Sequence, residues 1–356
     1  MQIPRYLTGY ESTYACAPRQ AALEWFRDAK FGLFLHYGLY SLMEGVHNGV
    51  DVMRSGAEWI RWAAPVPPSE YNKLAETFTA EAFDADAICD LAVEAGMRYL
   101  NLTTRHHDGF CLWDTATSAF KSTNSPARRD LIAEFASACD SHGLGCFLYY
   151  SHGRDWWHPH SPDNGRASCR PDTPEDRVHF RTGDAYDLNI YLDFVEAQVL
   201  ELCTMYSPIA GIWLDGIGEF YNMEGGVEAS RCLELYDKIR ATQPQILVSY
   251  KDGLTGTEDF FAPERKLRHG RGRAPADPHK YYEICTTLQP TSWGYRAADD
   301  GKHQDANWIM AQLDIASAIP ANVLLNTGPK GDGSIPEEDA VTLREVGRRL
   351  RATAAT

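Results

Sequence analysis

Residues 130–150 read DLIAEFASACDSHGLGCFLYY and contain one helix followed by one strand. A helical pattern runs over Leu131–His142, with Asp130 before it as a possible N-cap and Gly143 after it as a stop signal. The run Gly145–Tyr150 is then continuously apolar rather than alternating, as in strands covered on both faces. A helix that leads into a fully buried strand is the unit of parallel α/β proteins.

The same unit recurs along the whole chain. The expected strands are Phe31–His36, Tyr99–Thr103, Gly145–Tyr150, Ile209–Leu214, Ile246–Tyr250, Ile284–Leu288 and Val323–Asn326. The expected helices are Ala85–Ala95, Leu131–His142, Tyr186–Tyr206, Ala229–Thr242, Trp308–Ala318 and Glu337–Arg351. This alternation predicts a parallel sheet closed into a (β/α)8 TIM-like barrel, and a doubly wound open sheet is the alternative. We expect a single domain over residues 1–356, with its core at roughly 20–351.

The composition is that of a folded protein that binds neither nucleic acids nor membranes. Of the 356 residues, 44% are hydrophobic and 23% are charged, which is too apolar for a disordered chain. With 34 Lys and Arg against 49 Asp and Glu, the net charge is −15, which disfavours nucleic acids and anionic membrane surfaces. The longest apolar runs fall short of the roughly 18 residues that a transmembrane helix needs.

The cysteines and the N-terminus predict a cytoplasmic protein. Nine cysteines are scattered along the chain without a C-x-x-C motif, and several lie inside apolar runs, where a thiol behaves as a small hydrophobic group. This usage is typical of a reducing compartment. The first five residues, MQIPR, lack the apolar segment of a signal peptide.

Polar and aromatic residues gather where the expected strands end. In chain order these residues are His36, His106 with His107, Tyr150, Asp215 and Lys251. In a barrel, strand ends and the loops that follow them, here 41–80 and 252–282, form the face where active sites are built. Aromatic platforms with convergent histidines and carboxylates suit a sugar, which offers C–H faces for stacking and hydroxyls for hydrogen bonds.

Around these strand ends lie ordered motifs that carry a family resemblance. They include AKFGLFLHYG (29–38), LTTRHHDGF (102–110), LWD (112–114), RRDL (128–131), LYYS (148–151), IWLDG (212–216), SWGYR (292–296) and LLNTGP (324–329). Together they resemble the glycoside hydrolase family 29 α-L-fucosidases over roughly residues 20–350. The resemblance implies a retaining, exo-acting α-L-fucosidase that releases terminal L-fucose from fucosylated glycans through a covalent glycosyl-enzyme intermediate, without a cofactor.

Asp215 is the residue on which this reading depends. Directly after the apolar run Ile212–Leu214, a carboxylate equally suits the N-cap of a helix. The resemblance instead assigns Asp215 as the nucleophile that attacks the anomeric carbon. Because it must be ionised, it needs hydrogen-bond donors nearby.

The partner acid is less fixed in this family, and the loop 257–265 carries three acids. We predict Glu264 as the acid/base, with Asp259 and Glu258 as alternatives and Glu283 as an outside candidate. The proton donor of a retaining glycosidase lies about 5 Å from the nucleophile. We therefore expect burial and the nearby nucleophile to raise the pKa of Glu264 above its ordinary value.

The resemblance also implies a set of sugar-binding residues. These are His36, Glu58, Trp59, His106, His107, Tyr150, Trp213, Lys251 and Trp293. Strand alternation independently places Trp213 and Asp215 on the same face. A zinc site formed by His106 and His107 with histidines of the next loop, His152, His158 and His160, is the competing reading; we favour no metal, because regular ligand spacing is missing.

Three departures from the family pattern bear on specificity and assembly. Tyr37 stands where the family usually has Trp, and Lys251 stands where it usually has a sugar-binding Arg. Lysine donates from a point charge and lacks the planar fork of arginine. Many members also carry a C-terminal β-sandwich, which we expect this chain to lack; its oligomeric state stays open.

Two other functions remain compatible with the sequence. A related retaining glycosidase acting on another α-L-sugar, such as an α-L-galactoside, differs from a fucosidase only in accepting a hydroxyl on C6. A sugar-binding barrel that has lost catalysis would keep the histidines and tryptophans but lack one carboxylate.

Overall fold

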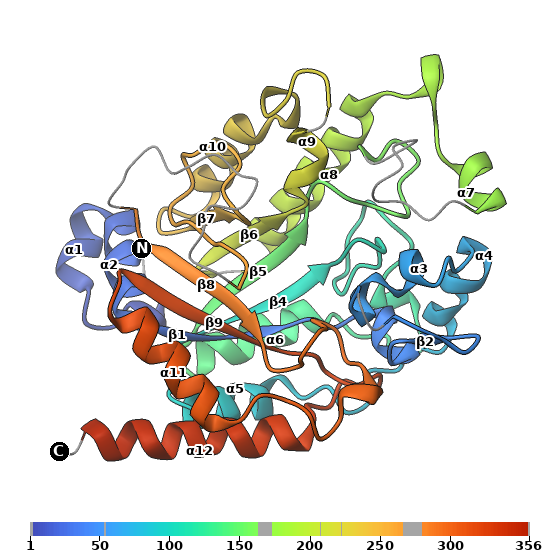
Figure 1. Cartoon of the computed structure of the whole chain (residues 1–356). Coiled ribbons are helices and arrows are strands. Elements are labelled where there is room, and N and C mark those ends of the chain that lie inside the picture. Colours follow the sequence, from blue (N-terminus) through green and yellow to red (C-terminus); the bar gives the residue numbers. More distant parts are fainter. Residues whose placement is uncertain are drawn as a thin grey trace.

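The computed structural model describes residues 3–52, 55–162, 173–206, 208–221, 223–265 and 280–354. Seven parallel strands form one curled sheet in the order β7-β6-β5-β4-β1-β9-β8 (Figure 1). They are β1 (Phe31–Leu35), β4 (Tyr99–Arg105), β5 (Gly145–Ser151), β6 (Gly211–Asp215), β7 (Leu247–Tyr250), β8 (Tyr282–Thr287) and β9 (Ala321–Thr327). The predicted α/β barrel is therefore confirmed, and the alternative, a doubly wound open sheet, is not formed.

Helices surround the sheet. The longer ones are α2 (Pro18–Ala29), α5 (Ala85–Glu94), α6 (Leu131–Ser141), α8 (Leu188–Met205), α10 (Cys232–Thr242), α11 (Ala306–Ser317) and α12 (Glu337–Ala354). Shorter elements are α1 (Glu11–Cys16), α3 (Ile60–Ala63), α4 (Pro68–Tyr71), α7 (Pro174–His179), α9 (Ile217–Tyr221) and a hairpin of β2 (Val46–His47) and β3 (Val50–Asp51). The N-caps expected for α5 and α6 are present, because Asp84 accepts from Ala87 N and Asp130 accepts from Ala133 N.

An irregular extended segment closes the gap between the two edge strands. Residues 259–265 form parallel bridges to both sides: Ala262 pairs with Lys251 after β7, and Phe261 and Glu264 pair with Tyr282 and Cys285 of β8. These residues, the closing segment, take the place of an eighth strand. The sequence predicts a long loop here, residues 252–282, because the apolar run of the segment is only three residues long and is followed by a proline, which has no N–H to donate.

Large side chains fill the inside of the barrel, and α2 covers its N-terminal end. Trp25 and Phe26 of α2 belong to one buried cluster with inward-facing residues such as Phe147 of β5. The Trp25 and Phe147 rings stack with centroids 6.5 Å apart. A side chain at Gly145 would place its Cβ 2.2 Å from Trp25, so this strand start requires glycine. Helix α2 was not among the predicted helices.

The described cysteines are free thiols, and all of them except Cys16 are buried; Cys169 lies outside the described residues. In the described part of the chain, none of the helices combines the length and the apolarity that crossing a bilayer requires.

Candidate active site

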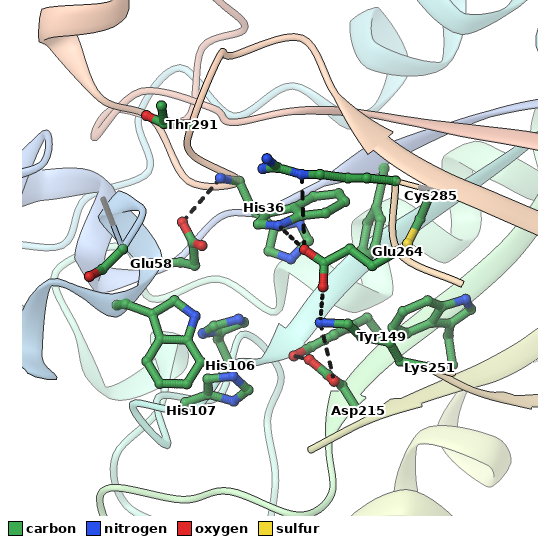
Figure 2. A pocket seen from close by; sticks show the side chains of 16 residues that line it. His36, Glu58, His106, His107, Tyr149, Asp215, Lys251, Glu264, Cys285 and Thr291 are labelled. Atoms are coloured by element: carbon green, nitrogen blue, oxygen red, sulfur yellow. Dashed lines mark hydrogen bonds and ion pairs between the residues drawn. The ribbon is translucent and has the colours of Figure 1, made fainter. Parts of the chain in front are cut away.

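A cavity of about 280 Å³ opens at the C-terminal ends of the strands (Figure 2). Its walls come from nearly every barrel strand and from the loops after β1 and β8. The lining residues are Phe34, His36, Ser55, Glu58, Trp59, His106, His107, Tyr149, Trp213, Asp215, Lys251, Glu264, Arg265, Cys285, Thr291 and Trp293. The structure thus brings together all but one of the predicted catalytic and sugar-binding residues.

Asp215 ends β6 and points into the cavity. Its Oδ2 accepts a hydrogen bond from the Tyr149 hydroxyl at 2.9 Å, and its Oδ1 accepts from Gly216 N at 2.7 Å. Burial opposes ionisation of this carboxyl, but Lys251, Arg154 and these two donors outweigh it and lower the pKa of Asp215. The side chain is therefore an anion at neutral pH, as a carboxylate nucleophile must be.

Lys251 lies between the two carboxylates of the cavity. Its Nζ is 3.8 Å from Asp215 Oδ1 and 2.6 Å from Glu264 Oε2 (Figure 2). Burial alone would favour the neutral amine, yet the two carboxylates raise the pKa of Lys251 and keep it charged. The two carboxylate oxygens lie no more than 6.4 Å apart (3.8 Å plus 2.6 Å).

Glu264 lies near the C-terminal end of the closing segment, where it pairs with Cys285 of β8. Besides Lys251, the indole N–H of Trp293 donates to its Oε1 at 3.2 Å. The cation of Lys251 outweighs burial and lowers the pKa of Glu264. The expectation of a raised pKa is therefore wrong, because it considered the nearby carboxylate of Asp215 but not the ammonium group between the two acids.

Two of the alternative acids lie elsewhere. Asp259 begins the closing segment at the opposite end of the barrel, where Arg19 of α2 donates to its Oδ1 at 2.7 Å and Val248 N donates to its Oδ2 at 2.8 Å. Glu258 accepts from the hydroxyl of Tyr236 at 3.0 Å and from backbone N–H groups. Both are buried structural anchors rather than pocket residues.

Glu283 lies inside the barrel beneath the cavity. The Tyr99 hydroxyl donates to its Oε2 at 2.7 Å, and the Trp213 indole N–H donates to its Oε1 at 2.9 Å. Burial raises the pKa of Glu283 to about 7. It fixes the orientation of Trp213 but does not line the cavity.

Two histidines present unprotonated nitrogens to the cavity. Asn326 donates through Nδ2 to Thr287 Oγ1 and to Trp293 O, and these two bonds fix the orientation of its amide. Its Oδ1 therefore faces His36 and accepts from Nδ1 at 2.7 Å, so the ring proton of His36 lies on Nδ1. Burial lowers the pKa of His36 to about 4, which leaves its Nε2 as an acceptor.

His107 is held in the same way. Ser151 Oγ donates to Arg154 O at 2.8 Å and therefore accepts from His107 Nδ1 at 2.7 Å. Burial lowers the pKa of both His106 and His107 well below the ordinary value. His106 stacks on Tyr149 with ring planes 14° apart. Neutral imidazoles of this kind accept hydrogen bonds from sugar hydroxyls.

Glu58 joins the first loop to the loop that follows β8. Its Oε2 accepts from the backbone N–H groups of Trp293 and Gly294 at 3.1 and 3.0 Å. Burial nevertheless raises the pKa of Glu58 to about 7. Trp59, the next residue, lies edge-on to His107 with ring centroids 4.9 Å apart.

Tyr150 is the predicted pocket residue that the structure places outside. Successive strand side chains point to opposite faces, and in β5 it is Tyr149 that faces inward, beside Trp213. Tyr150 faces outward, and its hydroxyl donates to Gln198 of α8 at 2.8 Å. The expected common face of Trp213 and Asp215 is confirmed, and the same alternation applied to β5 would have selected Tyr149.

Tyr37, which stands where the family usually has Trp, does not enter the cavity. Its ring stacks on Phe83 with planes 10° apart, and its hydroxyl donates to Gly331 O at 3.1 Å. Of the two residues that depart from the family pattern, Tyr37 and Lys251, only Lys251 lines the cavity.

The histidines after β5 do not converge with His106 and His107. His152 lies against Tyr250, with Nδ1 3.2 Å from the hydroxyl, and His158 stacks on Phe194 of α8. The zinc reading of these five histidines therefore has no support in the geometry.

Comparison with known proteins agrees with this geometry. The family model described as alpha-L-fucosidase matches residues 4–354. The chain belongs to this family. Its members are glycoside hydrolases, so the enzyme class and the family expected from the sequence motifs are confirmed.

Individual α-L-fucosidases match along almost the whole chain. A putative α-L-fucosidase of Caenorhabditis elegans is 28% identical over 92% of this chain and 65% of its own length. The structure of α-L-fucosidase isoenzyme 1 from Paenibacillus thiaminolyticus superposes with a TM-score of 0.80 at 34% identity, covering 95% of this chain and 77% of that one. The α-L-fucosidase AlfC from Lactobacillus casei, in complex with its α-L-fucose product, has a TM-score of 0.80 at 28% identity, covering 94% and 99%.

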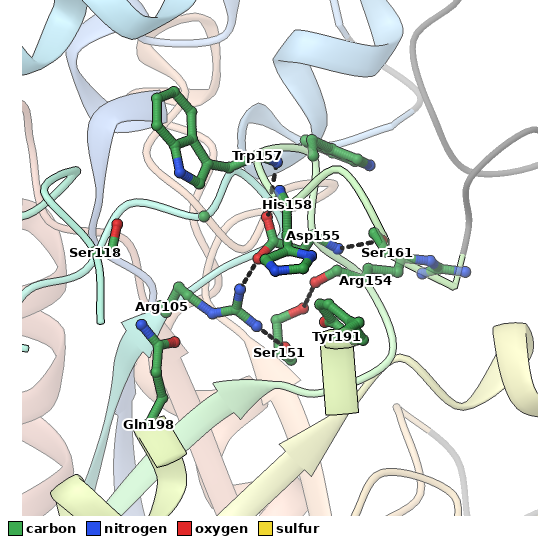
Figure 3. Close-up of polar contacts among 12 residues, drawn as sticks. Arg105, Ser118, Ser151, Arg154, Asp155, Trp157, His158, Ser161, Tyr191 and Gln198 are labelled. Atoms are coloured by element: carbon green, nitrogen blue, oxygen red, sulfur yellow. Dashed lines mark hydrogen bonds and ion pairs between the residues drawn. The ribbon is translucent and has the colours of Figure 1, made fainter. Parts of the chain in front are cut away.

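A buried ion pair supports the fucosidase pocket from behind. Arg105, the last residue of β4, pairs with Asp155 and donates to Ser151 O (Figure 3). Asp155 Oδ1 also accepts from the backbone N–H groups of Trp157 and His158 at 2.7 and 2.9 Å. This network fixes the loop that carries the Ser151 hydroxyl and the Arg154 carbonyl to which His107 is tied.

We expect replacement of Lys251 by Met to raise the pKa of Glu264 and of Asp215 by roughly 1 to 3, because the neutral side chain no longer favours their ionised forms. NMR titration of the side-chain carboxyl carbons measures both values. Lys251→Arg is the control, since it keeps the charge and should leave both pKa values low. Unchanged values in Lys251→Met would show that the ammonium group does not control them.

Tyr149 and Tyr150 form a matched pair for testing which tyrosine serves the pocket. Tyr149→Phe removes a donor to a buried carboxylate, and we expect kcat/KM for an aryl α-L-fucoside to fall roughly 10- to 100-fold. Because the pKa of Asp215 then rises, the acidic limb of the pH profile should move to higher pH. Tyr150→Phe should leave kcat/KM unchanged and cost about 1 kcal/mol of stability. Equal kinetic effects would contradict the assignment.

Proposed function

We propose that the chain is a retaining, exo-acting α-L-fucosidase that releases terminal L-fucose from fucosylated glycans through a covalent glycosyl-enzyme intermediate. The observation that carries the proposal is the pair of Asp215 and Glu264, held in one cavity by one ammonium group. Their oxygens are no more than 6.4 Å apart (3.8 Å plus 2.6 Å). Inverting glycosidases separate their carboxyl groups by about 6.5–9.5 Å and retaining ones by about 5–5.5 Å, so this spacing favours retention.

The size and the lining of the cavity support a single terminal sugar. A volume of about 280 Å³ is at the lower end of ligand pockets. Aromatic faces of Phe34, Trp213 and Trp293 suit the apolar faces of the ring, and the neutral histidines accept from its hydroxyls.

The proposed reaction has two steps. The Asp215 carboxylate attacks the anomeric carbon as the bond to the glycan oxygen breaks, and Glu264 gives that oxygen its proton. In the second step Glu264 takes a proton from water, the water oxygen replaces Asp215 on the anomeric carbon, and fucose leaves. Glu264 must therefore hold a proton once the sugar is bound. A bound sugar that accepts hydrogen bonds from Lys251 and excludes water disfavours the carboxylate form of Glu264. Both changes therefore raise the pKa of Glu264.

Asp215→Asn tests the nucleophile. The amide keeps the shape but cannot attack, so we expect kcat to fall by roughly 10³–10⁵ while the protein stays folded. With Asp215→Gly and an activated aryl fucoside, added azide should restore turnover by filling the vacated space. A variant that keeps about a tenth of kcat would exclude Asp215 from this role.

The sugar preference is tested by assaying the wild-type protein with an aryl α-L-fucoside and an aryl α-L-galactoside in parallel. Faster turnover of the fucoside supports the proposed function, and faster turnover of the galactoside supports the related glycosidase. Sugar binding without turnover of either substrate would indicate a sugar-binding barrel that has lost catalysis.

The acid/base is tested by dependence on the leaving group. Glu264→Gln should slow natural fucosides far more than aryl fucosides with acidic phenols, since good leaving groups need little protonation. The alkaline limb of the pH profile should also flatten. Glu58→Gln is the matched comparison, because Glu58 is the other protonatable carboxyl of the cavity. If only Glu58→Gln shows the leaving-group dependence, Glu58 is the proton donor and Glu264 is not.

A further inference from the structure

A second group of chemically reactive side chains lies outside the pocket, where the loop after β8 meets the start of α12. Asp300 and His303 of the loop and Glu338 of the helix each offer one ligand atom, and these atoms lie within 4.8 Å of one another. Gly301 N donates to Glu338 Oε1 at 3.0 Å, so loop and helix are already in contact; Figure 1 shows the loop beside α12. None of the three residues lines the fucosidase cavity.

His303 is the decisive member of the group. Its side chain is only 3% exposed, and Nδ1 lies 2.6 Å from Asp339 Oδ1. Asp339 is fully buried and also accepts from Thr327 Oγ1, so it acts as the acceptor and Nδ1 of His303 carries the proton. The other nitrogen, Nε2, is buried and has no hydrogen-bond partner among the described residues. It lies 3.6 Å from Glu338 Oε1.

This arrangement favours a positive charge at Nε2. A neutral ring would direct a lone pair at the carboxylate of Glu338, which is repulsive. Either a proton or a metal cation at Nε2 removes that repulsion. Because the carboxylates of Asp300, Glu338 and Asp339 surround this one imidazole, a divalent cation offsets more of their charge than a single proton does. An imidazole that donates its other N–H to a buried carboxylate is also the usual arrangement of a metal-binding histidine.

We propose that Asp300, His303 and Glu338 bind a zinc ion, with water completing its coordination. One imidazole nitrogen and two carboxylate oxygens suit Zn²⁺, whereas Ca²⁺ and Mg²⁺ prefer oxygen ligands alone. Zinc bonds of about 2.1 Å in tetrahedral geometry place ligand atoms roughly 3.4 Å apart. The exposed Asp300 and half-buried Glu338 close that distance by side-chain rotation.

The ion would stabilise the loop that carries Trp293. Tyr295, two residues beyond Trp293, donates its hydroxyl to Asp300 Oδ2 at 2.9 Å, so the proposed ligand already contacts the pocket-bearing part of the loop. The zinc ion is thus structural: it fastens residues 293–303 to α12 and takes no part in the chemistry of the cavity.

Calorimetric titration of the EDTA-treated full chain with ZnCl2 tests the site. We expect one equivalent to bind, the melting temperature to rise with zinc concentration, and kcat for an aryl α-L-fucoside to stay unchanged. Glu338→Gln should weaken zinc binding at least tenfold and abolish the rise in melting temperature. Glu337→Gln is the matched control: it removes the same charge from the same turn of α12, but its side chain is exposed and outside the group.

Asp300→Asn provides a second variant, at an exposed position and with an amide oxygen that can still accept from the Tyr295 hydroxyl; it should weaken zinc binding as Glu338→Gln does. Saturable zinc binding that both variants lose and Glu337→Gln keeps would establish the site. Wild-type protein that does not bind zinc, equal affinity in Glu338→Gln, or Ca²⁺ binding as tight as Zn²⁺ would overturn it. Activity with or without zinc reports separately on the fucosidase proposal.

Discussion

The ammonium group of Lys251 lies between a buried carboxylate, Asp215, and a half-buried one, Glu264, and the electrostatics of the pocket depend on these two ion pairs. Two carboxyl groups so close together in a largely desolvated cavity do not readily both ionise unless a cation compensates them, and the usual result is one strongly raised pKa. Here the cation lowers the pKa of both Asp215 and Glu264, and they in turn keep the buried lysine charged. Both carboxyl groups are therefore set up as anions, so the proposed nucleophile is ready for attack, and the proposed acid must gain its proton when the sugar binds. An arginine would spread the same charge over a planar fork; the lysine concentrates it at one point between the two acids.

The parallel barrel is what brings these three residues together from distant positions in the sequence. Neighbouring strands end at the same edge, and the register pairs Leu214 of β6 with Tyr250 of β7, which places Asp215 next to Lys251. The closing segment pairs Ala262 with Lys251, and Glu264 lies two residues further on the same side. The segment that closes the barrel thus also brings Glu264, the proposed acid/base, next to Lys251 and Asp215.

Much of this could be predicted from the sequence, and the errors have physical causes. Continuous apolar runs and helix caps located the barrel strands and most helices, and the residues after the strands marked the pocket edge. The closing segment was missed because its three apolar residues carry no periodic signal. Without it, Asp259 and Glu258 stayed alternatives to the predicted Glu264, although Asp259 and Glu264 lie near opposite ends of this segment. Tyr150 was chosen over Tyr149 because the alternation that fixed Trp213 was not applied to β5. The pKa of Glu264 depends on a lysine that is distant in sequence, and only the folded chain shows that contact.

The pattern of donors and acceptors also explains how the pocket distinguishes a sugar from other small polar molecules. Buried, neutral His36 and His107 are fixed by Asn326 and Ser151 so that each offers an acceptor nitrogen. With the carboxylates they make a wall rich in acceptors, which is matched by a ligand that donates from several directions, as a ring of hydroxyl groups does. The two cations of the cavity, Lys251 and Arg265, lie beside the acids and are already paired with them. A negatively charged ligand would therefore compete with Asp215 and Glu264 for the same cations, so the geometry that favours a neutral sugar disfavours anions.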